Sequence, residues 1–185
     1  MPAARGGARV WVCRSAAAAA LALACTAASG AGEALLRRPG QPPAISTVWG
    51  IISYTQWPAA APQVRLCVVG ETAYAADLLA GGPVAGNRTV QAQRLQAPEG
   101  LAECDALYAG QLAPGQWAQL MAAWPAQQPL LTISEDPVAC REGSMFCLQL
   151  QASNVGFELN LDAMARSGVR VNPRVFGLIR RKEAP

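Results

Sequence analysis

The side chains that could do chemistry in this sequence are limited by one absence, because its 185 residues include no histidine. Without imidazole, Ser–His–Asp and Cys–His nucleophile systems, His-ligated zinc sites and imidazole proton shuttles are all excluded. Glu135 or Asp136 near Glu158 would supply a carboxylate pair for hydrolysis, but acids in a loop that follows a strand are mostly just solvated. We therefore expect no catalytic residue and no enzyme.

A second chemical feature is the junction Val69-Gly70-Glu71, which falls between a predicted strand and a predicted helix. A helix N-terminus at this place can receive an anion, and the carboxyl edge of an α/β sheet can hold a small ligand. The junction has one glycine only, so it forms neither a dinucleotide fingerprint nor a P-loop. No cofactor is predicted.

The cysteines are the remaining reactive groups. Six are present, and an exported chain that loses Cys13 and Cys25 keeps the four at positions 67, 104, 140 and 147. In an oxidising compartment disulfides are the default, and four cysteines allow three connectivities. Neighbouring strands favour a Cys67–Cys104 bridge, and Cys140 and Cys147 can close a small loop; 67–140 or 67–147 would imply another strand order. No C-x-x-C or other close pair supports a redox motif or a metal site.

The first residues predict export. Residues 1–14 carry three arginines and no acid, and Ser15 to Ala24 is an Ala/Leu-rich apolar run too short to cross a membrane. We interpret residues 1–24 as a signal peptide and 25–43 as a flexible leader, which places the mature protein in the periplasm. Acylation of Cys25 as a lipoprotein is the second interpretation, since the residue three before it is the small Ala22.

From residue 44 to 182 the pattern predicts a single α/β domain. Apolar residues at helical spacing indicate a packed helix over 44–57, and short strands alternate with helices afterwards. The predicted strands are 64–70, 90–95, 104–110, 129–134, 144–150 and 155–159, and the predicted helices between them are 74–80 and 114–124. The last two strands form a hairpin, so we expect a mixed, largely parallel sheet of about five to six strands flanked by helices and held by two disulfides.

The segment from Val155 to Arg181 has the highest density of helix start and stop signals. Asn160 stands at the N-cap position of a short helix, and Gly168 stands where a left-handed C′ residue is favoured. Asn172-Pro173 repeats the start signal for a second helix. This segment is strongly basic, and a basic end suits an anionic membrane surface or nucleic acid. A solvated helix face is the commoner explanation, and no interleaved aromatics support nucleic acid.

Three aromatic side chains of the first helix offer a different function. Trp49, Tyr54 and Trp57 could line a ligand pocket, although packing in the core is the commoner role of such residues. A periplasmic small-molecule-binding protein is therefore the alternative to a protein that binds another protein.

The order and spacing of six motifs resemble the YfiR family. The motifs span residues 49–58, 66–70, 104–108, 131–135, 143–148 and 157–173, and the likeness extends from about residue 48 to residue 181. The resemblance implies an α/β domain with disulfides Cys67–Cys104 and Cys140–Cys147, in most members a homodimer.

The resemblance also implies a function. YfiR proteins are periplasmic repressors that bind the periplasmic sensor part of the membrane-bound diguanylate cyclase YfiN, which keeps cyclic-di-GMP synthesis low. An outer-membrane lipoprotein, YfiB, sequesters the repressor and relieves repression. We expect the partner-facing surface around Glu158, Met164 and Arg141, with Glu158 pointing outward because it alternates with Phe157 and Leu159. Loss of the disulfides would loosen the fold and relieve repression.

Overall fold

The computed structural model describes residues 42–57, 62–96, 98–125, 128–151 and 155–179. All of these residues belong to one compact unit of the chain. The expected signal peptide, Cys25 and the leader up to residue 41 lie outside the described residues.

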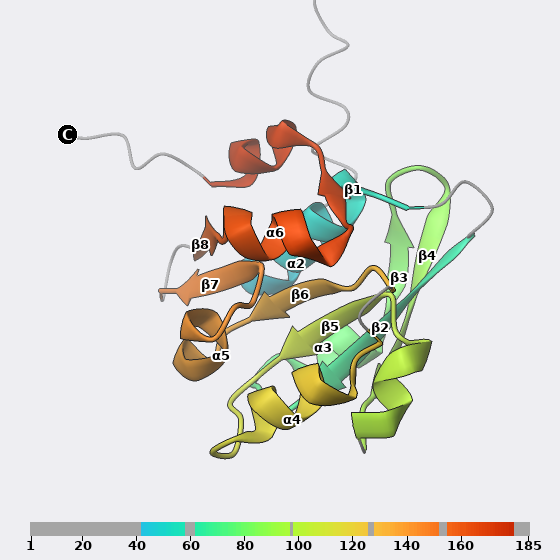
Figure 1. Ribbon diagram of the computed structural model, residues 1–185. Helices are drawn as coiled ribbons and strands as arrows, with labels where there is room; N and C mark the ends of the chain where they lie inside the picture. Colours follow the sequence, from blue (N-terminus) through green and yellow to red (C-terminus); the bar gives the residue numbers. More distant parts are fainter. Residues whose placement is uncertain (1–41, 58–61, 97, 126–127, 152–154, 180–185) are drawn as a thin grey trace, which may run out of the picture. The chain divides into compact units, whose positions relative to one another are not determined.

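Seven strands form one sheet in the order β3-β4-β2-β5-β6-β7-β8 (Figure 1). Its strands are β2 (Gln63–Val69), β3 (Gly82–Val84), β4 (Arg88–Arg94), β5 (Ala106–Ala109), β6 (Leu131–Ser134), β7 (Phe146–Leu150) and β8 (Val155–Leu159). Neighbours from β4 to β7 pair in parallel, while β3 and β8 pair antiparallel at the two edges. This confirms the mixed, largely parallel sheet, and β3 is the strand that the sequence pattern missed.

The five parallel strands have the order of a doubly wound sheet. β2 lies between β4 and β5. Numbered along the chain, the five parallel strands have the 2-1-3-4-5 order of flavodoxin-like folds. The chain changes direction across the sheet between β2 and β5, and in such sheets this switch point is where a crevice opens at the carboxyl ends of the strands.

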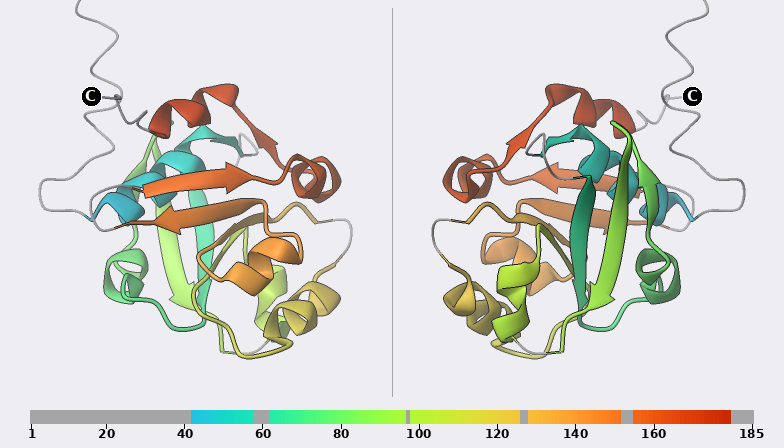
Figure 2. Two further views of the ribbon diagram at one scale, coloured as in Figure 1. Left: turned by 90° about the vertical axis from the view of Figure 1, so that its left-hand side faces the viewer. Right: turned by 90° about the vertical axis from the view of Figure 1, so that its right-hand side faces the viewer.

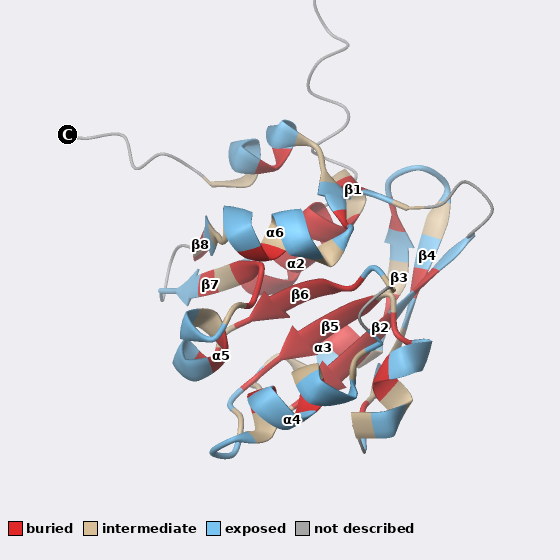
Figure 3. Ribbon diagram, in the orientation of Figure 1, coloured by how far each residue is buried: buried red, intermediate tan, exposed pale blue. Residues whose placement is uncertain are grey.

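Helices cover both faces of the sheet (Figure 2). One face carries α2 (Pro43–Tyr54) and α3 (Ala75–Leu79); the other carries the 3-10 helix η1 (Pro98–Glu103), α4 (Gln116–Ala123) and α5 (Pro137–Arg141). The central strands β5 and β6 and the last four residues of β2 therefore bury the side chains of both faces, as Figure 3 shows for the centre of the sheet. In β2, Leu66 and Val68 pack with α2, whereas Cys67 and Val69 pack with α4, so a continuous apolar strand is what the fold needs.

The helices of the C-terminal segment begin and end at the capping residues that the sequence predicted. Asn160 caps α6 (Leu161–Ser167) by accepting the N–H of Ala163 at 2.9 Å, and Gly168 ends this helix with φ 70°. Asn172 accepts the N–H of Arg174 at 3.0 Å and starts η2 (Pro173–Leu178). The second helix is a 3-10 helix of six residues.

The first and the last described elements contact each other. β1 (Thr55–Gln56) and β9 (Arg170–Val171) form a separate two-stranded antiparallel sheet. The N–H of Asn172 donates to the carbonyl of Tyr54 at 2.8 Å. A Cβ on Gly50 would lie 2.6 Å from Leu178, so α2 and η2 touch at this glycine.

Candidate functional site: the disulfide-bound hairpin

The hairpin of β7 and β8 carries an exposed polar surface on the face that α5 flanks. Phe146, Leu148 and Phe157 point into the core with α2, so the residues between them, Cys147 and Glu158, lie on the opposite face. These two are direct cross-strand partners in the ladder. Cys147 is bonded to Cys140 of α5, with a Cα–Cα distance of 5.5 Å, so a covalent bond fixes α5 beside this face.

Glu158 is exposed, as its alternation predicted. Its carboxylate accepts a hydrogen bond of 2.6 Å from the side-chain amide of Gln149 on β7. Gln149 is also exposed and pairs with Gly156 across the ladder. The carboxylate is thereby oriented at the surface, with its second oxygen available to a donor from outside.

Arg141 and Met164 lie differently with respect to Glu158. Arg141 is exposed at the end of α5, next to Cys140, and is therefore linked to the hairpin through the Cys140–Cys147 bond. Met164 of α6 is partly buried and packs against the core cluster that contains α2. We define the hairpin face as Arg141, Cys147, Gln149 and Glu158, and Met164 is not part of it.

The other disulfide lies inside the domain. Cys67 and Cys104 are bonded, both are fully buried, and their Cα atoms are 5.8 Å apart. Cys67 lies in the central strand β2, and Cys104 lies two residues before its neighbour β5. Both pairings implied by the resemblance are confirmed, and the first follows from β2 and β5 being adjacent.

The three aromatic side chains proposed for a ligand pocket share one core cluster. Trp49 is 4% exposed within this cluster, and Tyr54 and Trp57 pack against it. Trp57 also lines a cavity of about 370 Å³ together with Asp105, Gln128 and Arg170. Its indole N–H already donates to the carbonyl of Ile52 at 2.9 Å, so Trp57 offers a cavity ligand its ring alone.

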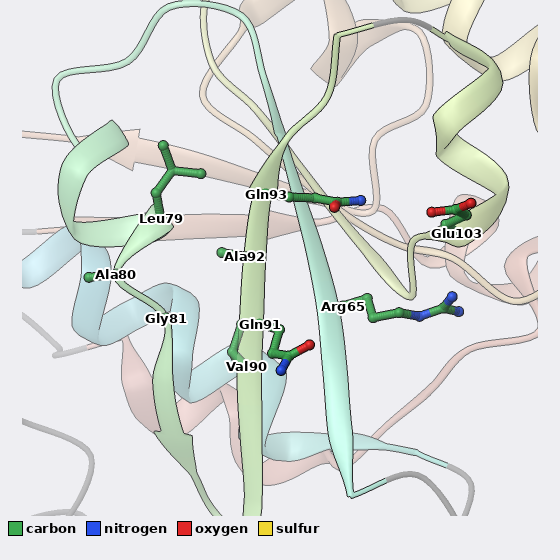
Figure 4. A pocket seen from close by; sticks show the side chains of 9 residues that line it. All are labelled: Arg65, Leu79, Ala80, Gly81, Val90, Gln91, Ala92, Gln93 and Glu103. Carbon is green, nitrogen blue, oxygen red and sulfur yellow. The ribbon is translucent and has the colours of Figure 1, made fainter.

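A larger cavity lies beside β4, where the sequence predicted no site (Figure 4). It measures about 450 Å³ and is lined by Arg65, Gln91, Gln93 and Glu103 with Leu79 to Gly81 of the α3–β3 link. The Arg65 guanidinium is bound by both carboxylate oxygens of Asp105, at 2.9 and 3.1 Å. This hydrogen bonding raises the pKa of Arg65 and leaves the cation satisfied, so Arg65 offers a ligand in the cavity no free charge.

The switch point between β2 and β5 is closed by backbone. Glu71 and Gln111 form a two-way bridge, with N–H to O distances of 3.0 and 2.8 Å. Gly110 permits this approach, because a Cβ there would lie 2.4 Å from the carbonyl oxygen of Glu71. The junction suggested for an anion is thus occupied by the chain itself.

The acids suggested for hydrolysis have structural partners. Asp136 caps α5, accepting the N–H groups of Val138 and Ala139 at 2.8 Å each. Glu135 accepts the hydroxyl of the fully buried Tyr108 at 2.7 Å. Burial raises the pKa of Tyr108 far above its ordinary value, and the bond to Glu135 raises it further. Within the described ranges, no cluster of His, Cys, Asp or Glu could hold a metal ion.

The fold and the hairpin face define a small α/β domain with an exposed, covalently fixed surface. Among the residues that the structure describes, no helix is both long and apolar enough to span a bilayer. Residues 44–180 match the model of a family described as YfiR/HmsC-like. The chain therefore belongs to the YfiR/HmsC-like family, whose members are periplasmic, non-catalytic regulators of diguanylate cyclase signalling.

Proposed function

We propose that this protein represses a membrane-bound diguanylate cyclase of the YfiN type by binding its periplasmic sensor part. The observation that carries the proposal is the family membership over residues 44–180. A repressor of this kind lowers cyclic-di-GMP synthesis because it binds the inactive state of the cyclase more tightly than the active state. A YfiB-type outer-membrane lipoprotein relieves repression by sequestering it. The repressor acts as a homodimer in the periplasm after removal of residues 1–24.

The hairpin face is the surface that we assign to the cyclase. The Glu158 carboxylate is exposed and oriented by Gln149, and the disulfide to α5 limits the loss of conformational entropy on binding. Arg141 adds a cation on the same covalently linked unit. Met164 contributes indirectly, since its packing against the core positions α6 directly after β8.

Charge reversal at Glu158 tests the assignment. With the purified periplasmic sensor domain of the cyclase, Glu158→Lys is expected to weaken binding at least tenfold, because truncating or reversing one partner of a desolvated charge pair costs about 2–5 kcal/mol. Isothermal titration calorimetry measures this change, and cellular cyclic-di-GMP is expected to rise. The matched control is Glu99→Lys on η1, another exposed acid, which should leave the affinity unchanged. Equal affinities of the two variants would exclude the hairpin face.

A redox input follows from the same proposal. Both disulfides hold elements that frame the domain, so reduction is expected to loosen the fold and relieve repression. Removing the buried bond with Cys67→Ala and Cys104→Ala together should lower stability and raise cyclic-di-GMP in the cell. If stability and repression both stay at wild-type levels in this double variant, the redox input is wrong.

The cavity at Trp57 favours a second candidate function, the binding of a small periplasmic metabolite. Its volume of about 370 Å³ lies in the range of known ligand sites, about 300–1,000 Å³. The indole ring offers an apolar surface, and Arg170 offers a cation. A ligand screen read by tryptophan fluorescence tests this function, and Trp57→Leu should abolish the quenching that a true ligand causes.

A further inference from the structure

The C-terminal elements present two cations and an aromatic ring to solvent close together in the chain. Arg170 of β9 and Arg174 of η2 are exposed, and Phe176 of η2 is 50% exposed. We define these three residues as the basic ridge. Figures 1 and 2 both show η2 at the outer end of the domain, where Val175 packs inward and Arg174 and Phe176 are exposed.

The charges of the ridge are not neutralised. Within the part of the chain that the structure describes, the side chains of Arg170 and Arg174 have no ion-pair or hydrogen-bond partner. Asp162, the acid nearest to Arg170 in the sequence, is paired with Arg166 of its own helix. The sequence adds Arg180, Arg181 and Lys182 directly after the last described residue, so positive charge continues beyond the ridge.

Phe176 packs its ring against the domain and leaves half of its side chain exposed. Its ring stacks on Phe157 of β8 with a centroid distance of 6.3 Å and an interplanar angle of 26°. One face of the ring is therefore fixed against the core, and half of the side chain remains in water. A half-exposed aromatic ring among unpaired cations is the combination that interfacial membrane contacts use, because the ring enters the headgroup region while guanidinium groups meet lipid phosphates.

We propose that the basic ridge holds this protein against an anionic lipid surface. A lipid surface fits better than an acidic protein segment, because the two cations lie on separate elements, Arg170 of β9 at the Trp57 cavity and Arg174 on the exposed side of η2, and positive charge continues along the chain. One cation alone attracts the protein to the lipid surface only weakly. Several cations together with an inserted ring give reversible attachment. The proposal does not rest on the binding of a cyclase, and it would confine the search for any membrane-bound partner to two dimensions.

Vesicle co-sedimentation tests the ridge. Protein purified from periplasmic extract is expected to bind phosphatidylcholine vesicles that contain phosphatidylglycerol and not pure phosphatidylcholine vesicles. Binding should be lost at about 1 M salt, where the screening length falls to about 3 Å. Arg170→Gln and Arg174→Gln should each weaken the partition coefficient about fivefold, since one basic residue near such a surface contributes about 1 kcal/mol. Phe176→Ser should weaken it at low salt, where the wild type binds.

The matched control is Arg141→Gln, which removes an exposed arginine on α5 and should leave vesicle binding unchanged. Circular dichroism melting shows whether each variant folds. Three results overturn the proposal: no binding to anionic vesicles, equal binding to both vesicle types, or unchanged binding by the Arg170/Arg174 double variant. Loss of cyclase binding by that double variant, with vesicle binding intact, would assign the ridge to an acidic protein and also overturn the lipid proposal. Glu158→Lys should spare vesicle binding, which separates this test from that of the proposed function.

Discussion

At the scale of single residues, most polar side chains of this domain have a structural task. Asp136 caps α5, Asp105 binds Arg65, and Glu135 receives the hydroxyl of Tyr108. Such pairs satisfy groups that burial would otherwise leave without partners. Glu158 differs, because among the described residues its only hydrogen-bond partner is the exposed amide of Gln149. For this reason we assign Glu158 to the contact with a partner protein.

Ionisation of Tyr108 at alkaline pH is expected to lower the stability of the domain. Its pKa is raised in the folded state by burial and by Glu135, so its stabilising effect is complete below the unfolded value of about 10 and is lost as pH rises above it. Denaturant unfolding at pH 7 and at about pH 11 should show a fall in the free energy of unfolding for the wild type. Tyr108→Phe should lose about 1–2 kcal/mol at pH 7 but show a smaller fall with pH. An identical fall in both proteins would contradict this assignment.

At the scale of elements, the closed switch point distinguishes this sheet from ligand-binding sheets of the same strand order. The bridge between Glu71 and Gln111 joins the two loops that would otherwise frame the crevice. Gly110 is essential to it, because a side chain would meet the carbonyl oxygen of Glu71. We accordingly assign the proposed partner surface to the edge hairpin rather than to the carboxyl ends of the central strands.

A methyl group at Gly110 should therefore separate the two loops. Gly110→Ala is expected to destabilise the domain by more than about 2 kcal/mol, since a contact of 2.4 Å with backbone must be relieved by movement of the chain. Gly177→Ala is the control, because a Cβ at Gly177 meets no atom within 4 Å. Equilibrium denaturation of both variants measures the difference, and near-equal midpoints would show that the bridge is dispensable.

The helices and strands also show which structural features can be predicted from the sequence alone. Continuous apolar strands, the caps at Asn160 and Asn172 and the left-handed Gly168 act locally, and all three features were predictable. β3 escaped prediction because Gly82-Pro83-Val84 has neither alternation nor a long apolar run, and it forms a strand only by pairing with β4. The packing of Met164 against the core and the place of Trp57 at a cavity depend on tertiary packing, which no local pattern records.

At the scale of the whole molecule, the two disulfides constrain the chain to different extents. Cys67–Cys104 spans 37 residues and joins the central strands, whereas Cys140–Cys147 spans 7 and joins α5 to the hairpin. In the loop-entropy model the first is worth about 4 kcal/mol and the second about 2 kcal/mol. The long loop therefore supports the fold, and the short one mainly shapes the hairpin face.

Removing each bridge separately should reveal this difference. The Cys67→Ala/Cys104→Ala protein is expected to lose about twice as much free energy of unfolding as the Cys140→Ala/Cys147→Ala protein, measured in urea. The second variant should instead show the larger loss of affinity for the cyclase sensor domain. The reverse order of stabilities would mean that strain or residual structure in the unfolded chain outweighs loop length.

The contact between α2 and the C-terminal elements has a consequence for the time course of folding. Thr55 pairs with Val171, and Gly50 faces Leu178, so the first helix completes its packing only after the last elements are available. Such distant pairings slow folding, because loop closure must precede the contacts that reward it. A chain still being synthesised thus carries a first helix without its final partner. Nearly the whole domain must leave the ribosome, or emerge from a translocation channel, before the native state can form.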